Sequence, residues 1–266
     1  MSPLGRVLII AGSDSGGGAG VQADLKTVMA LGGYATTAIT AITAQNTLGV
    51  FGVHAIPPEM VLAQGRAVLA DIGTDAVKTG MLASVAVIEA AAILIDEADA
   101  PAVVDPVMVA TSGARLIEAD ATAALRSLLI GRAALLTPNA PEAAALTGLS
   151  LSTTDDLRRA GEALLKAGAG AVLMKGGHIA GETVTDVLMT PAGETTYSGS
   201  RIDTRNTHGT GCTLASACAA GLAQGLSLED AVARAWAYVA EAIRQAPGLG
   251  TGAGPLNHGW TLHDKA

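Results

Sequence analysis

Short apolar runs alternate along this chain with longer segments in which apolar positions recur every three or four residues. The runs lie at residues 7–11, 34–44, 75–82, 102–109, 133–137 and 171–174. Runs of this length are typical of strands buried in a parallel sheet. Helical spacing is clearest at residues 120–130, 155–168 and 227–244, and helices are also expected at 21–26, 59–70, 84–97 and 143–147. Repeated strand–helix alternation predicts a doubly wound, mostly parallel α/β sheet with helices on both faces.

Two further segments, residues 184–190 and 195–200, have the pattern of short strands that pair antiparallel. No linker or repeat interrupts the 266 residues. The length suits a single α/β domain, so we expect residues 1–266 to form one unit.

Composition narrows the classes of partner. Half of the residues are hydrophobic and 15% are charged, so a large core is available. The formal net charge is −8, and the chain has only one Phe, two Trp and three Tyr. Nucleic acid and anionic membrane surfaces are therefore unexpected partners. The longest uncharged stretch contains Thr, Gln, Asn, Gly and Pro throughout, and residues 7–11 are too few for a signal sequence or a membrane span.

The two cysteines, Cys212 and Cys218, lie six residues apart in one expected helix. This spacing suits neither a disulfide framework nor a zinc cluster. It favours a reducing compartment, and we expect the protein to be cytoplasmic.

A glycine-containing turn at residues 206–214, Asn-Thr-His-Gly-Thr-Gly-Cys-Thr-Leu, leads into an Ala-rich segment expected to be a helix. Glycines let backbone amides approach a ligand, and a helix N-terminus adds unpaired N–H groups and partial positive charge. Together they predict an anion site suited to phosphoryl transfer, with Cys212 beside the acceptor hydroxyl and its thiol pKa lowered by the helix. The alternative is a glycine loop that only enters a buried helix.

A second glycine loop, residues 12–20, follows the first predicted strand. Its spacing does not match the dinucleotide-binding fingerprint, and no Walker A sequence is present. The loop could close over a small substrate. Asp24, on the helix that follows, would then be a polar anchor or, alternatively, a solvated carboxylate.

Polar residues recur where the predicted buried strands end. Because ligands bind beyond the carboxyl ends of parallel strands, these residues predict an active site at one edge of the sheet. Each also has a structural alternative, since an Asp before Pro forms turns and an Asn before a helix caps it. The residues are Asp14, Gln45, Asp105, Asn139 and Lys175.

Nearly the whole chain resembles the hydroxymethylpyrimidine/phosphomethylpyrimidine kinases of thiamine biosynthesis, within the ribokinase-like superfamily. The resemblance rests on motifs that occur in the same order. They are residues 10–20 (IAGSDSGGGAG), 22–24 (QAD), 43–47 (TAQNT), 78–82 (KTGML), 104–108 (VDPVM), 137–142 (TPNAPE), 175–178 (KGGH), 206–212 (NTHGTGC) and 254–258 (GPLNH).

The resemblance implies a ribokinase-like fold and two ATP-dependent steps at one site. The first phosphorylates the hydroxymethyl group of 4-amino-5-hydroxymethyl-2-methylpyrimidine, and the second converts the monophosphate to the diphosphate. ATP and Mg²⁺ are the implied cofactors. The implied catalytic residues are Cys212, Gly209, Gly211 and Lys175. Substrate-binding residues would be Gly12, Asp24, Gln45, Met81 and Val107. ATP would contact Asp105, Asn139, Lys175, Thr207, Thr210 and Gly211, and Mg²⁺ would lie near Asp105, Asn139 and Glu142.

Two rival functions stay open from the sequence. A pyridoxal kinase of vitamin B6 salvage acts on a similar flat ring, although Gln45 favours an aminopyrimidine. A non-catalytic binding protein on the same fold is the other, since fold does not determine function. Family resemblance also implies a homodimer. Trp236 departs from the Lys expected in many relatives, which leaves the adenine contacts unassigned.

Overall fold

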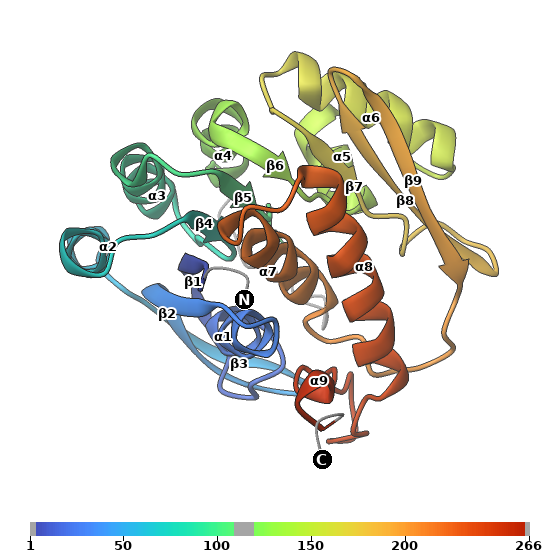
Figure 1. Ribbon diagram of the computed structural model, residues 1–266, viewed down its shortest axis with the longest axis horizontal. Helices are drawn as coiled ribbons and strands as arrows, with labels where there is room; N and C mark the ends of the chain where they lie inside the picture. The colour runs from blue at the N-terminus through green and yellow to red at the C-terminus, as the bar shows by residue number, and fades with distance from the viewer. Residues whose placement is uncertain (1–3, 109–119, 264–266) are drawn as a thin grey trace.

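The computed structural model describes residues 4–108 and 120–263, and in this part of the chain nine strands form one sheet (Figure 1). The strand order is β3-β2-β1-β4-β5-β6-β7-β8-β9. The strands are β1 (Arg6–Ser13), β2 (Tyr34–Asn46), β3 (Gly49–Ala55), β4 (Ala76–Thr79), β5 (Ala102–Val104), β6 (Ala133–Leu136), β7 (Val172–Met174), β8 (Thr183–Thr190) and β9 (Gly193–Ser200). The six central strands, β2-β1-β4-β5-β6-β7, run parallel to their neighbours in this group. The outer strands β3, β8 and β9 pair antiparallel.

The predicted doubly wound sheet and the antiparallel pair β8–β9 are confirmed. Strand β3 was not predicted. It forms a hairpin with β2 at the edge of the sheet, and most of its residues are exposed, so no buried apolar pattern marks it. β5 is three residues long, shorter than the apolar run from which it was predicted. The last residue of that run, Val109, lies outside the described residues.

Helices cover both faces of the sheet (Figure 1). On one face lie α1 (Gly20–Ala30), α7 (Thr210–Ala223), α8 (Leu228–Arg244) and the short α9 (Trp260–His263). On the other lie α2 (Pro58–Asp71), α3 (Val85–Ala98), α4 (Ala121–Leu128), α5 (Ala140–Thr147) and α6 (Thr154–Lys166), with a 3₁₀ turn, η1 (Ile130–Arg132). The two helical layers bury one apolar core on each side of the sheet.

The central strand β1 shows why its sequence is continuously apolar. Leu8 and Ile10 belong to the core beneath α2 and α3, whereas Val7, Ile9 and Ala11 belong to the core beneath α1 and α7. All five are fully buried. Successive side chains of a strand point to opposite faces, so a strand covered on both faces needs an apolar residue at every position.

Helix α7 is the most enclosed helix on its face, lying between α1, α8 and the sheet (Figure 1). Its sequence is mostly Ala, Gly and Ser, and these small residues permit close approach of the neighbouring backbone. A Cβ added to Gly221 would lie 2.7 Å from the Cβ of Ala231 on α8. The helix is therefore held tightly along its length.

Membrane association through a spanning helix has no support in the described part of the chain, because none of its helices is long and apolar enough to cross a bilayer.

The buried His258 predicts a loss of stability in acid. Its Nε2 lies 3.1 Å from Thr213 Oγ1, which donates its own proton to the Gly209 carbonyl, so neutral His258 donates to Thr213. Burial lowers the pKa of His258 to about 4, with Lys26 and His208 adding to the effect. Below the ordinary pKa of about 6.5, the unfolded chain binds a proton that the folded chain does not. Stability should therefore fall by about 2–3 kcal/mol as the pH drops from 7.5 to 4.5.

Urea unfolding of the wild type and His258→Asn across this pH range measures the effect. We expect the variant to lose much of the acid-induced decrease in unfolding free energy. His54→Asn is the matched control, because His54 is exposed on β3 and its replacement should leave the pH dependence unchanged. Parallel pH profiles for the wild type and His258→Asn would contradict the prediction.

Candidate active site

A cavity of about 930 Å³ lies at the carboxyl ends of the parallel strands. Residues in or just after the carboxyl ends of β1, β2, β4, β5, β6 and β7 form one wall, and the turn before α7 also lines the cavity. Residues of β8, β9 and α8 line the far side. The predicted gathering of polar residues at one edge of the sheet is confirmed, since the cavity is lined by Asp14, Gln45, Asp105, Asn139 and Lys175.

Helix α7 opens onto this cavity through its N-terminus. Gly209 is the N-cap and has φ +84°, and its neighbours Thr207, Thr210, Gly211 and Cys212 also line the cavity. No side chain caps the helix. The positive end of the helix dipole and its first-turn amides therefore face the space where a ligand would lie, as an anion site requires.

Gly209 has no room for a side chain. An added Cβ would lie 1.8 Å from the carbonyl oxygen of Gly18, in the glycine loop that follows β1. The positive φ would strain the alanine as well, by about 1–3 kcal/mol. We therefore expect Gly209→Ala to lower the free energy of unfolding by more than strain alone.

Gly225→Ala supplies the control. Gly225 has φ +80°, and an added Cβ would meet nothing within 4 Å, so this variant isolates the backbone strain. Denaturant unfolding should show Gly209→Ala to be less stable than Gly225→Ala by at least about 1 kcal/mol. Equal stability would show that the two loops separate freely.

Cys212 lies in the first turn of α7, but its thiol is not activated in the way the sequence suggested. Burial raises the pKa of Cys212 to about 11, with Lys78 opposing the rise and Asp24 and Asp105 adding to it. The prediction of a lowered pKa is wrong, because desolvation of the thiolate outweighs the helix dipole and the nearby ammonium. Cys212 is therefore a neutral thiol at physiological pH.

A cation and two carboxylates form the second group in the cavity. Lys175 Nζ lies 2.9 Å from Asp105 Oδ1 and 3.7 Å from Glu142 Oε2, and Thr137 donates to the same Asp105 oxygen at 2.9 Å. Burial raises the pKa of Glu142 to about 7, with Lys175 opposing. Burial also opposes the charge on Lys175, but Asp105 and Glu142 keep its pKa above the ordinary value.

Asn139 is the N-cap of α5, as one of its two predicted roles required. Its Oδ1 accepts from the Glu142 amide at 2.9 Å, and Glu142 Oε2 accepts from the Asn139 amide at 2.8 Å, which completes a capping box. This cap fixes Glu142 beside Lys175. The Asn139 side-chain oxygen is used within the cap, so the cap positions the carboxylate.

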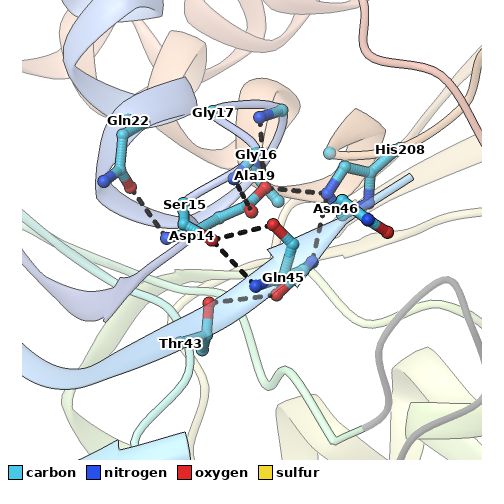
Figure 2. Close-up of polar contacts among 12 residues, drawn as sticks. Asp14, Ser15, Gly16, Gly17, Ala19, Gln22, Thr43, Gln45, Asn46 and His208 are labelled. Atoms are coloured by element: carbon cyan, nitrogen blue, oxygen red, sulfur yellow. Dashed lines mark hydrogen bonds and ion pairs between the residues drawn. The ribbon is translucent and has the colours of Figure 1, made fainter. Parts of the chain in front are cut away.

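The glycine loop after β1 is organised around Asp14 (Figure 2). Asp14 Oδ1 accepts from the Gly16 amide at 2.8 Å, and Oδ2 accepts from the Ala19 amide at 2.8 Å and the Gly18 amide at 3.1 Å. His208 Nε2 lies 2.8 Å from the same Oδ2. Burial opposes the charge, but these bonds lower the pKa of Asp14 below its usual value. Asp14 thus joins the glycine loop at residues 12–20 to the turn before α7.

Gln45 reaches the cavity from the end of β2, close to this junction (Figure 2). Its side-chain amide lies 3.3 Å from His208 Nε2 on one side and 3.3 Å from Thr43 Oγ1 on the other. The Gln45 amide, which we predicted could recognise a polar ring edge, therefore lies in the cavity wall.

Asp24 takes neither of its two predicted positions. It is fully buried, and it does not line the cavity. Both of its oxygens lie 2.8 Å from Lys78 Nζ, and Ser216 donates to Oδ1 at 2.7 Å. The alternative of a solvated carboxylate is wrong. Asp24 therefore acts on the cavity indirectly, because it fixes the position of Lys78, and Lys78 lines the cavity.

The apolar part of the cavity includes Met81 and Val107, as predicted for the neighbours of a ring. Gly12 leaves the space that the Met81 methyl group fills, since a Cβ there would lie 2.4 Å from Met81 Cε. On the far side, Trp236 packs against Gly199 of β9. The nearby Asp186 is buried, and burial raises its pKa while the Gly176 amide, which donates to Oδ1 at 2.7 Å, opposes the rise.

Sequence reasoning did not assign a role to His208, Lys78 or Ser216. His208 and Lys78 lie inside motifs that were recognised, but their partners, Asp14 and Asp24, are 194 and 54 residues away in sequence. No local pattern shows such a pairing. The one available signal was that a lysine within a strand predicted to be buried needs a buried counter-ion.

The fold and this cavity define an α/β kinase of the ribokinase-like type, with an anion-binding helix N-terminus facing acidic and basic side chains. The chain belongs to the phosphomethylpyrimidine kinase family, whose model matches residues 14–257.

Relatives and solved structures agree with this assignment. The hydroxymethylpyrimidine/phosphomethylpyrimidine kinase of Streptomyces coelicolor is 51% identical over 96% of this chain and 95% of its own length. The thiamine biosynthesis bifunctional protein ThiED of Geobacter sulfurreducens is also 51% identical over 96% of this chain, which spans about half (52%) of that longer relative. The pyridoxal kinase from Staphylococcus aureus in complex with ADP superposes with a TM-score of 0.90 at 36% identity, covering 96% of this chain and 94% of that structure.

Proposed function

We propose that this protein transfers phosphate from ATP to 4-amino-5-hydroxymethyl-2-methylpyrimidine, and then to the monophosphate so formed, in thiamine biosynthesis. The observation that carries the proposal is the composition of the cavity. It joins the α7 anion turn and Cys212 to the amide of Gln45, in a chain whose family is phosphomethylpyrimidine kinase. An amide matches the donor–acceptor edge of an aminopyrimidine.

Each wall of the cavity has a separate task in this proposal. Gln45 binds the ring edge, and Met81 and Val107 pack against the ring beside Gly12. Gly209, Gly211 and the first-turn amides of α7 stabilise the charge on the transferred phosphoryl group, while Thr207 and Thr210 border the phosphates. In this proposal the acceptor hydroxyl would lie beside Cys212.

Lys175 neutralises phosphate charge in the proposed complex, held in place by Asp105 and Glu142. The side chains also suit Mg²⁺. Among the described residues no three His, Cys, Asp or Glu gather as a closed metal site. Two carboxylates open to the cavity match the way Mg²⁺ is held, through one or two carboxylates, water and phosphates. Asp105 and Glu142 would hold it near the Asn139 cap, and it would supply charge neutralisation of the phosphates.

A neutral thiol at Cys212 is compatible with this reaction. Phosphoryl transfer passes through a largely dissociative transition state, so the acceptor proton can leave late and a strong base is not required. Cys212 would then orient the hydroxyl, and the hydroxyl proton would pass to an oxygen of the transferred phosphoryl group after the bond to phosphorus forms.

The test is ATP consumption by purified protein with magnesium and one of three acceptors: the hydroxymethylpyrimidine, its monophosphate or pyridoxal. We expect turnover on both pyrimidines well above turnover on pyridoxal. Preference for pyridoxal would instead support a vitamin B6 kinase and remove the role given to Gln45. Inactivity on all three, with ATP still bound, would contradict the kinase proposal for these acceptors.

We also propose that the protein is a cytoplasmic homodimer. The edge hairpin β2–β3 supports an association between copies, because it exposes Ile42, Phe51 and Val53, with Phe51 70% exposed. Light scattering after size exclusion should give twice the monomer mass, and Phe51→Lys with Val53→Lys should give the monomer. A wild-type protein that is monomeric at micromolar concentration would contradict the dimer.

A further inference from the structure

The side-chain amide of Gln45 lies between two partners that determine which way round it faces (Figure 2). In the drawn orientation Nε2 faces His208 Nε2 at 3.3 Å, and Oε1 faces Thr43 Oγ1 at 3.3 Å. A primary amide can turn over by 180°, exchanging its oxygen and nitrogen with almost no change in shape. The hydrogen-bond partners decide between the two orientations.

Thr43 can only accept a hydrogen bond from Gln45. Its hydroxyl carries one proton, and this proton is donated to the Ser13 carbonyl at 2.8 Å, because a carbonyl oxygen can only accept. Toward Gln45 the hydroxyl therefore presents lone pairs. The amide nitrogen satisfies this contact, whereas the amide oxygen would place two acceptors against each other.

His208 can only donate toward Gln45 from the same nitrogen. Nε2 lies 2.8 Å from Asp14 Oδ2, which also accepts from the amides of Gly18 and Ala19. A carboxylate that accepts from several donors is ionised and has no proton to give. Nε2 therefore carries the hydrogen, which Asp14 accepts at 2.8 Å and which the Gln45 amide oxygen, at 3.3 Å, can share as a second acceptor.

From these contacts we infer that Thr43 and His208 hold the Gln45 amide with its nitrogen toward Thr43 and its oxygen toward His208. Both mismatches of the drawn orientation are then removed. One of the two amide hydrogens is then donated to Thr43, and one of the two oxygen lone pairs accepts from His208. The second N–H and the second lone pair remain for a ligand. The N–H, on the Thr43 side, can bind only an acceptor, and the lone pair, on the His208 side, can bind only a donor.

This direction agrees with the chemistry of the proposed substrate, and the inference rests on that proposed function. In the hydroxymethylpyrimidine, the ring acceptor N3, the 4-amino donor and the 5-hydroxymethyl group follow one another along one side of the ring. With N3 on the Thr43 side and the amino group on the His208 side, the hydroxymethyl group extends toward the residues after His208. Those residues, Gly209 to Cys212, are the α7 anion turn. The opposite amide orientation would direct the hydroxymethyl group away from it.

Thr43, His208 and, behind them, Asp14 are thus positioning residues for substrate orientation. They act through Gln45, and their removal should change which ring edge is accepted more than it changes the phosphoryl-transfer machinery. This separates the inference from a purely structural role, which would affect all acceptors equally.

The experiment compares the 4-amino substrate with its 4-oxo analogue, 5-hydroxymethyl-2-methylpyrimidin-4-one, in which N3–H donates and the 4-oxygen accepts. The analogue reverses the edge and leaves the hydroxymethyl group unchanged. Wild-type protein should prefer the 4-amino compound by at least about 100-fold in kcat/KM, because the reversed edge leaves polar groups unpaired. In Thr43→Val the freed amide can serve either order, and the preference should fall at least about tenfold. Thr43→Ser keeps the hydroxyl and should restore it.

His208 gives an independent pair of variants. His208→Gln retains an N–H donor near the position of Nε2 and should preserve the preference, whereas His208→Met removes the donor and should reduce it. Thermal unfolding of each variant identifies any that fail to fold. Calorimetric affinities for the two pyrimidines provide the same ratio without turnover, so the orientation is tested even in a slow variant.

Two results would overturn the inference while leaving the proposed function standing. One is wild-type protein that turns over the 4-amino compound but does not discriminate against the 4-oxo compound. The other is a Thr43→Val variant that loses activity on both compounds equally with an unchanged ratio. Wild-type protein that binds the 4-amino compound selectively but never phosphorylates it would refute the proposed kinase function and support the orientation.

Discussion

Cys212→Ala slows phosphoryl transfer by about 10²-fold and leaves ATP affinity within about threefold of the wild type. The thiol lies in the first turn of α7 and lines the cavity beside the amides proposed to form the anion site. Its removal takes away the group that would orient the acceptor hydroxyl. The backbone amides that would bind phosphate are untouched. Steady-state kinetics with the hydroxymethylpyrimidine, together with calorimetric binding of a non-hydrolysable ATP analogue, separate the two effects.

Cys218→Ala is the matched control. Cys218 lies in the same helix, is fully buried among the core residues on that face and does not line the cavity. Its replacement should leave turnover within about twofold, although stability falls slightly. Near-normal turnover by Cys212→Ala would remove Cys212 from the chemistry.

Lys78→Met should lower the free energy of unfolding by about 3–5 kcal/mol and the melting temperature by about 10 °C. Both side chains of the Lys78–Asp24 pair are 0% exposed, and Lys78 donates to both carboxylate oxygens at 2.8 Å. Burial opposes the charge on Lys78, yet Asp24 keeps its pKa above the ordinary value. Without the ammonium, Asp24 is left as a buried carboxylate whose main counter-charge is gone.

The double variant Lys78→Met with Asp24→Asn tests this cause. It removes both charges and leaves an amide oxygen for Ser216, so it should recover more than half of the lost stability. Lys166→Met is the surface control, because Lys166 is 80% exposed and lies 3.9 Å from Glu162. That variant should change stability by less than about 0.5 kcal/mol. A Lys78→Met variant as stable as Lys166→Met would show that the buried pair contributes little.

Much of the fold was predictable because apolar periodicity reports burial directly. The run at residues 7–11 predicted a central strand, and β1 is covered on both faces. The edge strand β3 was missed for the same reason, since its exposed residues carry no burial signal. Cap chemistry is also local, and Asn139 caps α5 as its position before that helix indicated.

The electrostatics of the site were less predictable, because they depend on residues far apart in sequence. A helix N-terminus alone predicted an acidic thiol at Cys212, yet burial raises its pKa to about 11. Asp24 was predicted to be either a polar anchor for the substrate or a solvated carboxylate, yet it is buried against Lys78 of β4 and Ser216 of α7. Such pairs form where helices and strands that are distant in sequence pack together in the fold, so no local sequence pattern predicts them.

The close packing of α7 has a consequence for how this enzyme scaffold can diversify. Small side chains lock the helix against α1, α8 and the sheet, so the anion turn at its N-terminus has little freedom to change. The residues proposed to recognise the acceptor lie elsewhere, at the ends of β2, β4 and β5. Mutations at the strand ends can therefore change which alcohol is accepted without changing the anion turn of α7. We expect natural drift between vitamin precursors to accumulate at Thr43, Gln45, Met81 and Val107, with α7 nearly invariant.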